Sequence, residues 1–529
     1  MLRRCSPVAL ERDLVTTPTD GNPTGGNPTG GNPTGGNPTG GNPTGGNLAD
    51  LVAAAAARTP DKPALLCGAR VLSWAELQDR VARVAGGLQA LGLAPGDRVA
   101  VHLGNVPDFA VLYFAVLRAG LVAVPVNTGY TATELLHVLG DSGARLVVTT
   151  PGSPVQELDP APEHVVTDLA TLDGPAVTDA VGCGEDLAVV LYTSGTSGRP
   201  RGAMLSHRAL LANLEQAAAI EPPVIGGDDV VLLVLPLFHV YGLNGALGMV
   251  AHSGATGVLA ERFDPVETLE LVRRHAVTSL VGAPPMWVAW SMLPDVEGAF
   301  TSVRVALSGA APLPPAVLHR VLDTTGHHVF EGYGLTETAP VLTSTLMSEV
   351  AKPGSIGRPL PGIELRLLDE RGREVEEGDP GEIVVRGANL FSGYWPDGVE
   401  GPDADGWFAT GDIAVADADG DLRLVDRRKE LVLVSGFNVY PREVEEVLAA
   451  HPAVAECAVL GVPHPYTGES VKALVVLNPG RSLSADEAIA HCARSLARFK
   501  CPTSVEVVEG LPHSATGKVS KGQLRERSA

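Results

Sequence analysis

The chain has 529 residues, too many for one hydrophobic core, so at least two domains are expected. The net charge of −22 excludes nucleic acid as a natural partner, because its phosphates would be repelled, and it argues against a basic membrane-binding face. The apolar runs are too short for a transmembrane helix, so no membrane span is expected.

The cysteines are scattered and form no C-x-x-C pair. They are Cys5, Cys67, Cys183, Cys457, Cys492 and Cys501. This pattern is typical of a reduced cytoplasmic protein rather than of a disulfide framework or a zinc site. Charged residues at positions 11–13 interrupt any apolar region near the start, so no signal peptide is predicted.

Residues 1–47 are predicted to form a disordered leader. Positions 21–45 are five consecutive copies of Gly-Asn-Pro-Thr-Gly, which offer no apolar side chain to bury. We expect no catalytic role for this leader, with binding of a partner as the alternative.

Residues 48–426 are predicted to form a large domain in which helices and strands alternate, a pattern that indicates mainly parallel sheets. The predicted helices are 48–57, 74–91 (with Ser73 as cap) and 106–119, and the predicted strands are 99–103, 121–125, 145–149, 187–191, 230–235, 279–281 and 303–307. From 362 to 426 short strands alternate with Gly-Asp and Asp-Gly turns, which is typical of antiparallel structure.

Residues 427–529 are predicted to form a smaller α+β domain. The expected elements are a helix at 441–449, strands at 455–460 and 472–477, and a helix opened by a capping box of Ser484 and Glu487. The apolar face of that last helix is predicted to carry Ile489, Cys492, Leu496 and Phe499. The predicted class is therefore α/β: a large domain of mixed sheets flanked by helices, with a small antiparallel barrel-like part, and a mobile α+β lid.

The run from Tyr192 to Gly202 combines three glycines, four Ser/Thr hydroxyls after the tyrosine and two arginines, and it follows an apolar strand. Glycines let backbone N–H groups converge, hydroxyls donate, and arginines add positive charge, which are the requirements for holding a polyphosphate. No Walker A spacing fits the run.

Further motifs follow in order. They are Tyr333-Gly334-Leu335-Thr336-Glu337, Thr410-Gly411-Asp412, Asp426-Arg427-Arg428-Lys429-Glu430 and Pro512-His513-Ser514-Ala515-Thr516-Gly517-Lys518. Together with the glycine-rich run they resemble the adenylate-forming superfamily of acyl-CoA synthetases, peptide-synthetase adenylation domains and luciferases. The resemblance extends from about Leu48 to Arg525.

The resemblance implies residues for ATP and Mg²⁺. The residues expected to wrap the β- and γ-phosphates are Thr193, Ser194, Gly195, Thr196, Ser197 and Gly198. Arg201 stands where the family usually has lysine, and it keeps the positive charge. Glu337 resembles the magnesium carboxylate, with Thr193 as a second ligand, and Thr336 resembles the phosphate hydroxyl.

The resemblance also implies an adenosine site and a mobile catalytic lysine. The segments expected to line adenine contain Gly309, Ala310, Gly332, Tyr333 and Gly334, with the Tyr333 ring stacking on the base. Asp412 is expected to bind the ribose diol, and Arg427 to contact ATP beside a pivot at Lys429. Lys518 is expected to bridge the carboxylate and the α-phosphate, and Gly436 to open the path of the CoA pantetheine arm.

The acid pocket is expected beside the segment Pro236–Gly242. His239 either touches the substrate carboxylate or packs as an aromatic gate. The segment has no aspartate for an α-amine, and Arg262 is a candidate cation for a dicarboxylate or a surface residue. Nearby apolar residues favour a medium- to long-chain fatty acid; they are Leu243, Leu247, Met249 and Met286.

The predicted activity is that of an acyl-CoA synthetase, which uses a small-molecule carboxylic acid, ATP and CoA. The alternatives are an enzyme that loads a carrier protein, a ligase for a short, dicarboxylic or aryl acid, an inactive scaffold and a luciferase-type oxygenase. The oligomeric state stays open, with a homodimer as one alternative.

Overall fold

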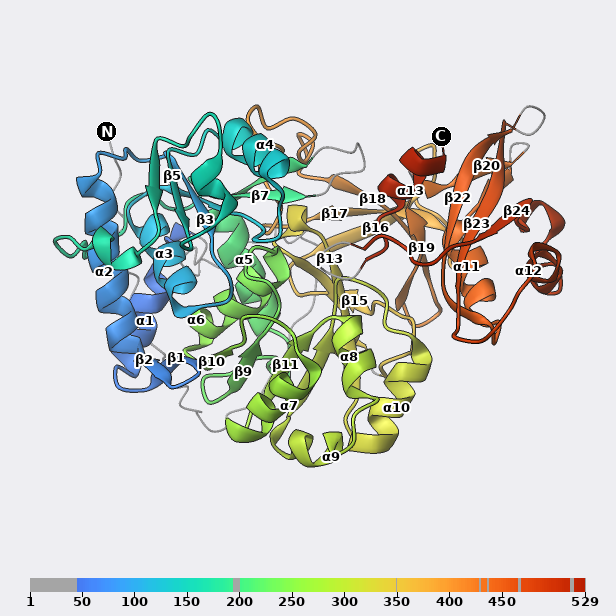
Figure 1. The fold of residues 1–529 in the computed structure, drawn as a ribbon, viewed down its shortest axis with the longest axis horizontal. Coiled ribbons are helices and arrows are strands. Elements are labelled where there is room, and N and C mark those ends of the chain that lie inside the picture. Colours follow the sequence, from blue (N-terminus) through green and yellow to red (C-terminus); the bar gives the residue numbers. More distant parts are fainter. Residues whose placement is uncertain are drawn as a thin grey trace, which may run out of the picture.

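The structure is a computed structural model that describes residues 45–193, 200–348, 350–427, 430–434, 437–464, 468–513 and 518–528. Figure 1 shows a large body made of the blue to yellow segments and a smaller orange and red unit at one side. This division agrees with the expectation that the chain forms at least two domains.

The first sheet of the large domain has six strands in the order β6-β5-β3-β4-β7-β8, parallel except for the last pair. The strands are β3 (Arg98–His102), β4 (Val122–Pro125), β5 (Leu146–Thr149), β6 (His164–Val166), β7 (Leu187–Thr193) and β8 (Arg201–Ser206). The associated helices are α2 (Trp74–Ala90), α3 (Pro107–Arg118) and α4 (Ala132–Ser142). Ser73 and Glu76 form a complete capping box at α2, which confirms the predicted start of this helix.

The second sheet has nine strands in the order β15-β14-β13-β12-β11-β9-β10-β1-β2. Its strands are β1 (Pro63–Cys67), β2 (Arg70–Ser73), β9 (Val230–Leu233), β10 (Thr256–Leu259), β11 (Ser279–Gly282), β12 (Val305–Ser308), β13 (Val329–Gly334), β14 (Val341–Ser344) and β15 (Arg358–Pro359). The helices within this part of the chain, together with the first one, are α1 (Asp50–Arg58), α5 (His207–Ala218), α6 (Met249–Ser253), α7 (Pro265–Arg274), α8 (Pro284–Trp290), α9 (Val296–Ala299) and α10 (Pro315–Thr325). The strands predicted at 230–235, 279–281 and 303–307 are therefore confirmed, and each observed end lies within two residues of the predicted one.

A four-stranded antiparallel sheet follows, as the turn pattern predicted. It has the order β16-β17-β18-β19, with β16 (Glu364–Leu368), β17 (Gly381–Arg386), β18 (Phe408–Ala416) and β19 (Leu422–Arg427). It lies between the large body and the small unit in Figure 1.

The small domain contains a five-stranded sheet and three helices. The elements are β20 (Val432–Val434), β21 (Phe437–Val439), α11 (Pro441–Ala449), β22 (Val454–His464), β23 (Gly468–Leu477), α12 (Ala485–Cys492), β24 (Ser504–Val507) and α13 (Lys521–Ser528). The capping box at Ser484 is confirmed. However, α12 ends at Cys492, so Leu496 and Phe499 lie beyond the helix; they still pack against the core of the small domain.

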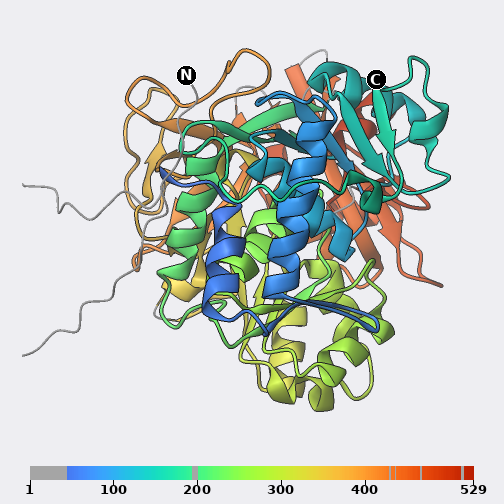
Figure 2. The ribbon, with the colours of Figure 1, turned by 90° about the vertical axis from the view of Figure 1, so that its left-hand side faces the viewer.

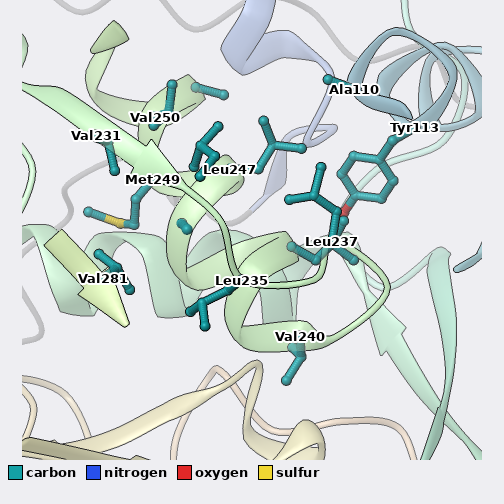
Figure 3. Close-up of a cluster of buried hydrophobic side chains, with 14 of the residues drawn as sticks. Ala110, Tyr113, Val231, Leu235, Leu237, Val240, Leu247, Met249, Val250 and Val281 are labelled. Carbon is teal, nitrogen blue, oxygen red and sulfur yellow. The ribbon is translucent and has the colours of Figure 1, made fainter. Parts of the chain in front are cut away.

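The core of the large domain lies between its sheets and helices (Figure 3). Leu247 and Met249 point into this core together with Leu235 and Val281. Each of these four side chains is at most 8% exposed. Removing aliphatic and thioether groups from water stabilises the fold. Leu243 and Met286, the other predicted apolar neighbours of the acid pocket, are also buried.

The described chain is anchored to the body at its beginning. Asn47 is 1% exposed, and its side-chain Nδ2 lies 3.0–3.2 Å from the carbonyls of Leu117, Val181 and Gly182. The backbone N–H of Leu48 donates to Nδ1 of His207 at 3.1 Å. Asn47 thus packs as part of the large domain, and α1 continues from it beside α2 (Figure 2).

Cys67, Cys457, Cys492 and Cys501 are free thiols, as expected, whereas Cys183 is disulfide-bonded and departs from that expectation. Across the part of the chain that the structure describes, no helix is both long and apolar enough to cross a membrane.

Candidate active site

The phosphate-binding run begins where the first sheet ends. Thr193 is the last residue of β7, and it pairs with Arg201, the first residue of the antiparallel strand β8. The run between them is therefore held at both ends by one pair of neighbouring strands. Ser194, Gly195, Thr196, Ser197 and Gly198 lie outside the described residues.

Helix α4 also holds both ends of this run. The hydroxyl of Tyr192 donates to Asp141 Oδ2 at 2.5 Å, and His137 Nε2 lies 3.2 Å from the carbonyl of Pro200. Burial and the hydrogen bond to Asp141 raise the pKa of Tyr192, so its hydroxyl keeps its proton and remains a donor.

Glu337 lies beyond the end of β13 in the second sheet, near Arg201. It lies with Thr336 on the short 3-10 helix η6 (Thr336–Thr338), which follows β13. Its Oε1 accepts a hydrogen bond from the hydroxyl of Tyr394 at 2.5 Å. Tyr394 is joined to β8 by an isolated bridge to Ala203, so Glu337 and Arg201 belong to one region.

Arg201 is already engaged by protein groups. Its Nη1 is 2.8 Å from Glu400 Oε2, and its guanidinium carbon lies 3.8 Å from the centroid of the Tyr394 ring. The hydrogen bond to Glu400 is the largest cause that raises the pKa of Arg201, and the charges of Glu400, Tyr394 and Glu337 act in the same direction. Arg201 therefore carries its positive charge beside the carboxylate of Glu337.

The donor set on this side fits Mg²⁺. The hydroxyl of Thr193 and the carboxylate of Glu337 are hard oxygen ligands, and magnesium commonly uses only one or two protein oxygens beside phosphates and water. No nitrogen or sulfur ligand is needed to complete such a site.

Tyr333 and Asp412 meet on the adenosine side. The Tyr333 hydroxyl donates to Asp412 Oδ2 at 2.7 Å, and both side chains are buried. Tyr333 belongs to β13 together with Gly332 and Gly334, whereas Asp412 belongs to β18. A Cβ on Gly334 would lie 1.7 Å from the carbonyl oxygen of Pro340, so glycine is required there by space.

Gly309 and Ala310 follow β12, the strand next to β13. A Cβ on Gly309 would lie 2.9–3.1 Å from the ring of Tyr241, so this glycine lets the ring approach the strand end. Ala310 has a positive φ of 70°, which is uncommon for a residue with a side chain and marks a strained turn. The two residues thus connect the adenine segment to the wall of the acid pocket.

The chain is described up to Arg427 at the boundary between the two domains. Arg427 ends β19 and pairs in register with Asp412 across the β18–β19 hairpin. The carboxylate of Asp426 accepts a hydrogen bond from the backbone N–H of Arg442 at the start of α11. The last strand of the large domain is therefore tied to the first helix of the small domain. Lys429 and Gly436 lie outside the described residues.

The charge of Lys518, in the small domain, acts on His239 of the large domain. Burial, followed by the charge of Lys518, lowers the pKa of His239 to about 4. Neutral His239 accepts a hydrogen bond from the N–H of Tyr241 through Nδ1 at 3.3 Å. The lysine of the small domain therefore exerts its charge at the predicted wall of the acid pocket.

The acid wall continues as a π-helix, η4 (Tyr241–Gly248), which the sequence did not predict. π-Helices are rare and frequently occur at functional sites. Three glycines lie along it at positions 242, 245 and 248, and a Cβ on Gly245 would meet the ring of Tyr241 at 2.9 Å. Arg262, the candidate cation for a dicarboxylate, is exposed.

Two residues of this region, Glu331 and Tyr394, were not predicted from the sequence. Glu331 is 5% exposed, and its Oε1 accepts the N–H of Leu313 at 2.9 Å; burial raises its pKa. An acidic residue inside a buried strand just before the Tyr333 motif was the available signal. Tyr394 had no comparable signal, because an aromatic residue between two antiparallel strands is ordinarily assigned to packing.

The chain belongs to the family of AMP-binding enzymes. The model of the AMP-binding enzyme family matches residues 52–395, and that of the AMP-binding enzyme C-terminal domain matches residues 443–518.

Curated relatives cover most of the chain. It is 36% identical over 530 residues to a long-chain-fatty-acid–CoA ligase of Yersinia pestis, covering 90% of this chain and 94% of the relative. It is 39% identical over 486 residues to a feruloyl-CoA synthase of Amycolatopsis sp, covering 89% and 96% respectively.

Solved structures agree with this fold. ATP-bound MatB from Rhodopseudomonas palustris superposes with a TM-score of 0.84 at 36% identity, covering 90% of this chain and 98% of MatB. The apo form of MatB gives a TM-score of 0.73. The arrangement described here is therefore closer to the ATP-bound form than to the apo form.

Proposed function

We propose that the protein is an acyl-CoA synthetase. It activates a carboxylic acid with ATP to an acyl-adenylate and pyrophosphate, and then transfers the acyl group to CoA with release of AMP. The observation that carries this proposal is the buried Tyr333–Asp412 hydrogen bond on the adenosine side, together with the Thr193, Arg201 and Glu337 group on the phosphate side. The charge of Lys518, which acts on His239 at the acid wall, agrees with it.

In the first step the acid carboxylate attacks the α-phosphorus, and negative charge develops on the phosphate oxygens. Preorganised positive groups stabilise such charge most effectively. We assign this role to the Lys518 ammonium, which lies close enough to His239 to lower its pKa. His239 is neutral at pH 7, so it orients groups in the pocket without adding a charge.

The ATP contacts follow from the same groups. Thr193, with residues 194–198, holds the β- and γ-phosphates, and Thr336 adds a hydroxyl. Asp412 accepts the ribose diol while the Tyr333 ring covers adenine, flanked by Gly309, Ala310, Gly332 and Gly334. Thr193 and Glu337 would hold magnesium, which would supply positive charge against the phosphate oxygens.

In the second step the small domain presents another face to the same site. We propose that the pivot is Lys429, that Arg427 contacts ATP beside it, and that Gly436 gives the pantetheine arm room. The domains themselves we set at 48–426 and 427–529, after the leader 1–47, whose last residue, Asn47, packs against the large domain. The cytoplasm, where ATP and CoA are both available, is the proposed compartment.

The proposed acid is a medium- to long-chain fatty acid. The residues that follow the acid wall are apolar and buried, and the exposed position of Arg262 removes the one cation that the sequence offered for a second carboxylate. The name of the Yersinia pestis relative points in the same direction. An aryl acid is the second candidate, because the Amycolatopsis relative is named a feruloyl-CoA synthase.

The test is a panel of acids from acetate to palmitate, with malonate, benzoate and ferulate, assayed for AMP release with and without CoA. The proposal expects the highest kcat/KM for a fatty acid of eight or more carbons and faster AMP release when CoA is added. Faster release with a carrier-protein arm but not with CoA would assign the enzyme to carrier loading. Highest kcat/KM for ferulate would assign an aryl acid.

A further inference from the structure

One segment connects the two sides of the phosphate site. In residues 391–400, the N–H of Phe391 donates to the carbonyl of Glu337 at 2.9 Å, and the N–H of Trp395 donates to the carbonyl of Gly202 at 2.8 Å. The first contact holds the backbone of the predicted metal carboxylate, and the second holds the strand that carries Arg201.

Tyr394 lies at the centre of this segment, with its hydroxyl on Glu337. The 2.5 Å contact to Oε1 is in the range of strong O–H···O⁻ bonds, which are roughly twice as strong as neutral ones. A phenolic hydroxyl keeps its proton at neutral pH, so it donates this hydrogen bond to the carboxylate. A donor on one oxygen of a carboxylate restricts the direction in which its other oxygen points.

The ring of Tyr394 is itself held on two sides. The guanidinium of Arg201 stacks over it at 3.8 Å, and Phe391 packs edge-on with ring centroids 5.1 Å apart. Glu400 fixes Arg201 from the same segment through the 2.8 Å ion pair. A planar guanidinium can stack on a ring and pair with a carboxylate at once, whereas a lysine ammonium is a compact point charge.

We propose that Tyr394 is a positioning residue for Glu337. We further propose that Arg201 holds the Tyr394 ring in place, a role called the brace below, rather than acting mainly as a phosphate clamp. This inference rests on the proposed function, in which Glu337 is a ligand of the magnesium bound with ATP. This role also explains why position 201 is an arginine in this chain, because a planar cation can stack on the Tyr394 ring and pair with Glu400 at once.

The experiment measures Mn²⁺ binding to the full-length protein with ATP and without an acid, so that no turnover takes place. Tyr394→Phe keeps the ring and removes only the hydroxyl. The expected result is an increase of about tenfold in the half-saturating Mn²⁺ concentration, the size associated with one hydrogen bond to a charged group. In turnover assays with Mg²⁺, kcat falls about tenfold while KM for the acid stays unchanged.

The matched control is Tyr113→Phe, which removes a buried tyrosine hydroxyl that has no hydrogen-bond partner among the described residues and does not touch Glu337. It should leave Mn²⁺ binding unchanged. Glu337→Gln tests the metal role itself. If Glu337→Gln weakens Mn²⁺ binding and Tyr394→Phe does not, the positioning role is overturned. If neither variant weakens it, the assignment of Glu337 as a metal ligand fails.

Arg201→Lys tests the brace. It should weaken Mn²⁺ binding by about threefold, and the Arg201→Lys, Tyr394→Phe double variant should bind no more weakly than Tyr394→Phe alone, because residues that act through one another are not additive. If Arg201→Lys raises the Kd of ATP and leaves the Mn²⁺ midpoint unchanged, Arg201 is a phosphate clamp and the brace is overturned.

Discussion

Tyr333 and Asp412 are 79 positions apart in the chain and are joined by one hydrogen bond. A tyrosine and an aspartate in separate motifs would each allow several roles. Their contact fixes the carboxylate beside the ring, so that one face can meet the base and the ribose of the same nucleotide. At the scale of single residues, the proposed adenosine side therefore contains a tyrosine and an aspartate that are held together by the fold.

Tyr333→Phe should raise KM for ATP about tenfold and change kcat less, because the ring remains while Asp412 loses a hydrogen bond that orients it. Steady-state kinetics with ATP varied at saturating acid and CoA measure this difference. Tyr113→Phe is the matched control, since the buried hydroxyl of Tyr113 has no partner among the described residues. Equal changes of KM in both variants would contradict the assignment.

At the scale of elements, the anchor around Asn47 joins the start of the chain to α3 and α5. A chain that begins at Gly45 should keep the kcat of the full-length protein, because every residue assigned to the site lies after it. Asn47→Ala should lower the free energy of unfolding by about 2 kcal/mol, because buried carbonyls lose their hydrogen-bond donor. Thermal unfolding of both forms provides the measurement. An unchanged Tm for Asn47→Ala would mean that the anchor contributes nothing.

His207 makes the same anchor sensitive to pH. Burial lowers its pKa to about 4, and the charge of Asp186 opposes this only in part. As the pH falls from about 6.5 toward 4, the unfolded chain binds a proton that folded His207 does not, so stability is present above about 6.5 and declines below it. The maximum effect is about 3 kcal/mol.

His207→Gln should therefore reduce the loss of stability between pH 7 and pH 5, although His239 retains its own share of the slope. Urea unfolding at several pH values measures this. His319→Gln changes an exposed histidine and should keep the slope of the parent protein. If the dependence of stability on pH is the same in His207→Gln as in the parent protein, the His207 imidazole binds a proton equally well in the folded and the unfolded chain.

Elements with a local signal were predicted well from the sequence, and elements that depend on distant contacts were not. Helix α2 follows from Ser73, Glu76 and the apolar spacing, all within one stretch of chain. Helix α12 was predicted too long, because Leu496 and Phe499 continue the apolar spacing although the chain turns after Cys492. The π-helix of Tyr241–Gly248 and the Tyr394–Glu337 bond have no local signal, since each depends on partners elsewhere in the fold.

At the scale of the whole molecule, the two half-reactions should be separable. Lys518→Ala should slow acyl-adenylate formation by about 10²–10³, the size expected for removing a partner of transition-state charge. Transfer from pre-made acyl-adenylate to CoA should be spared, because Lys518 acts only in the first arrangement. Gly436→Leu should do the reverse, since the added side chain obstructs the pantetheine arm.

Pyrophosphate exchange and acyl-adenylate-to-CoA transfer, measured on both variants, give the comparison. Parallel loss of both activities in both variants would mean that the two steps share one arrangement of the domains. The rotation that we propose about Lys429 would then have to be abandoned.

The order of strands in the second sheet also has a consequence for how the chain folds as it is synthesised. Leu65 of β1 pairs with Gly257 of β10, about 190 positions later, while β3 to β8 of the first sheet all lie between residues 98 and 206. Non-local pairing is slow because a long loop must close first. The edge of β1 that pairs with β10 therefore stays unpaired until β10 has left the ribosome. An unpaired edge is open to association with other chains, so the period between the synthesis of β2 and that of β10 is when a nascent chain is most exposed to aggregation.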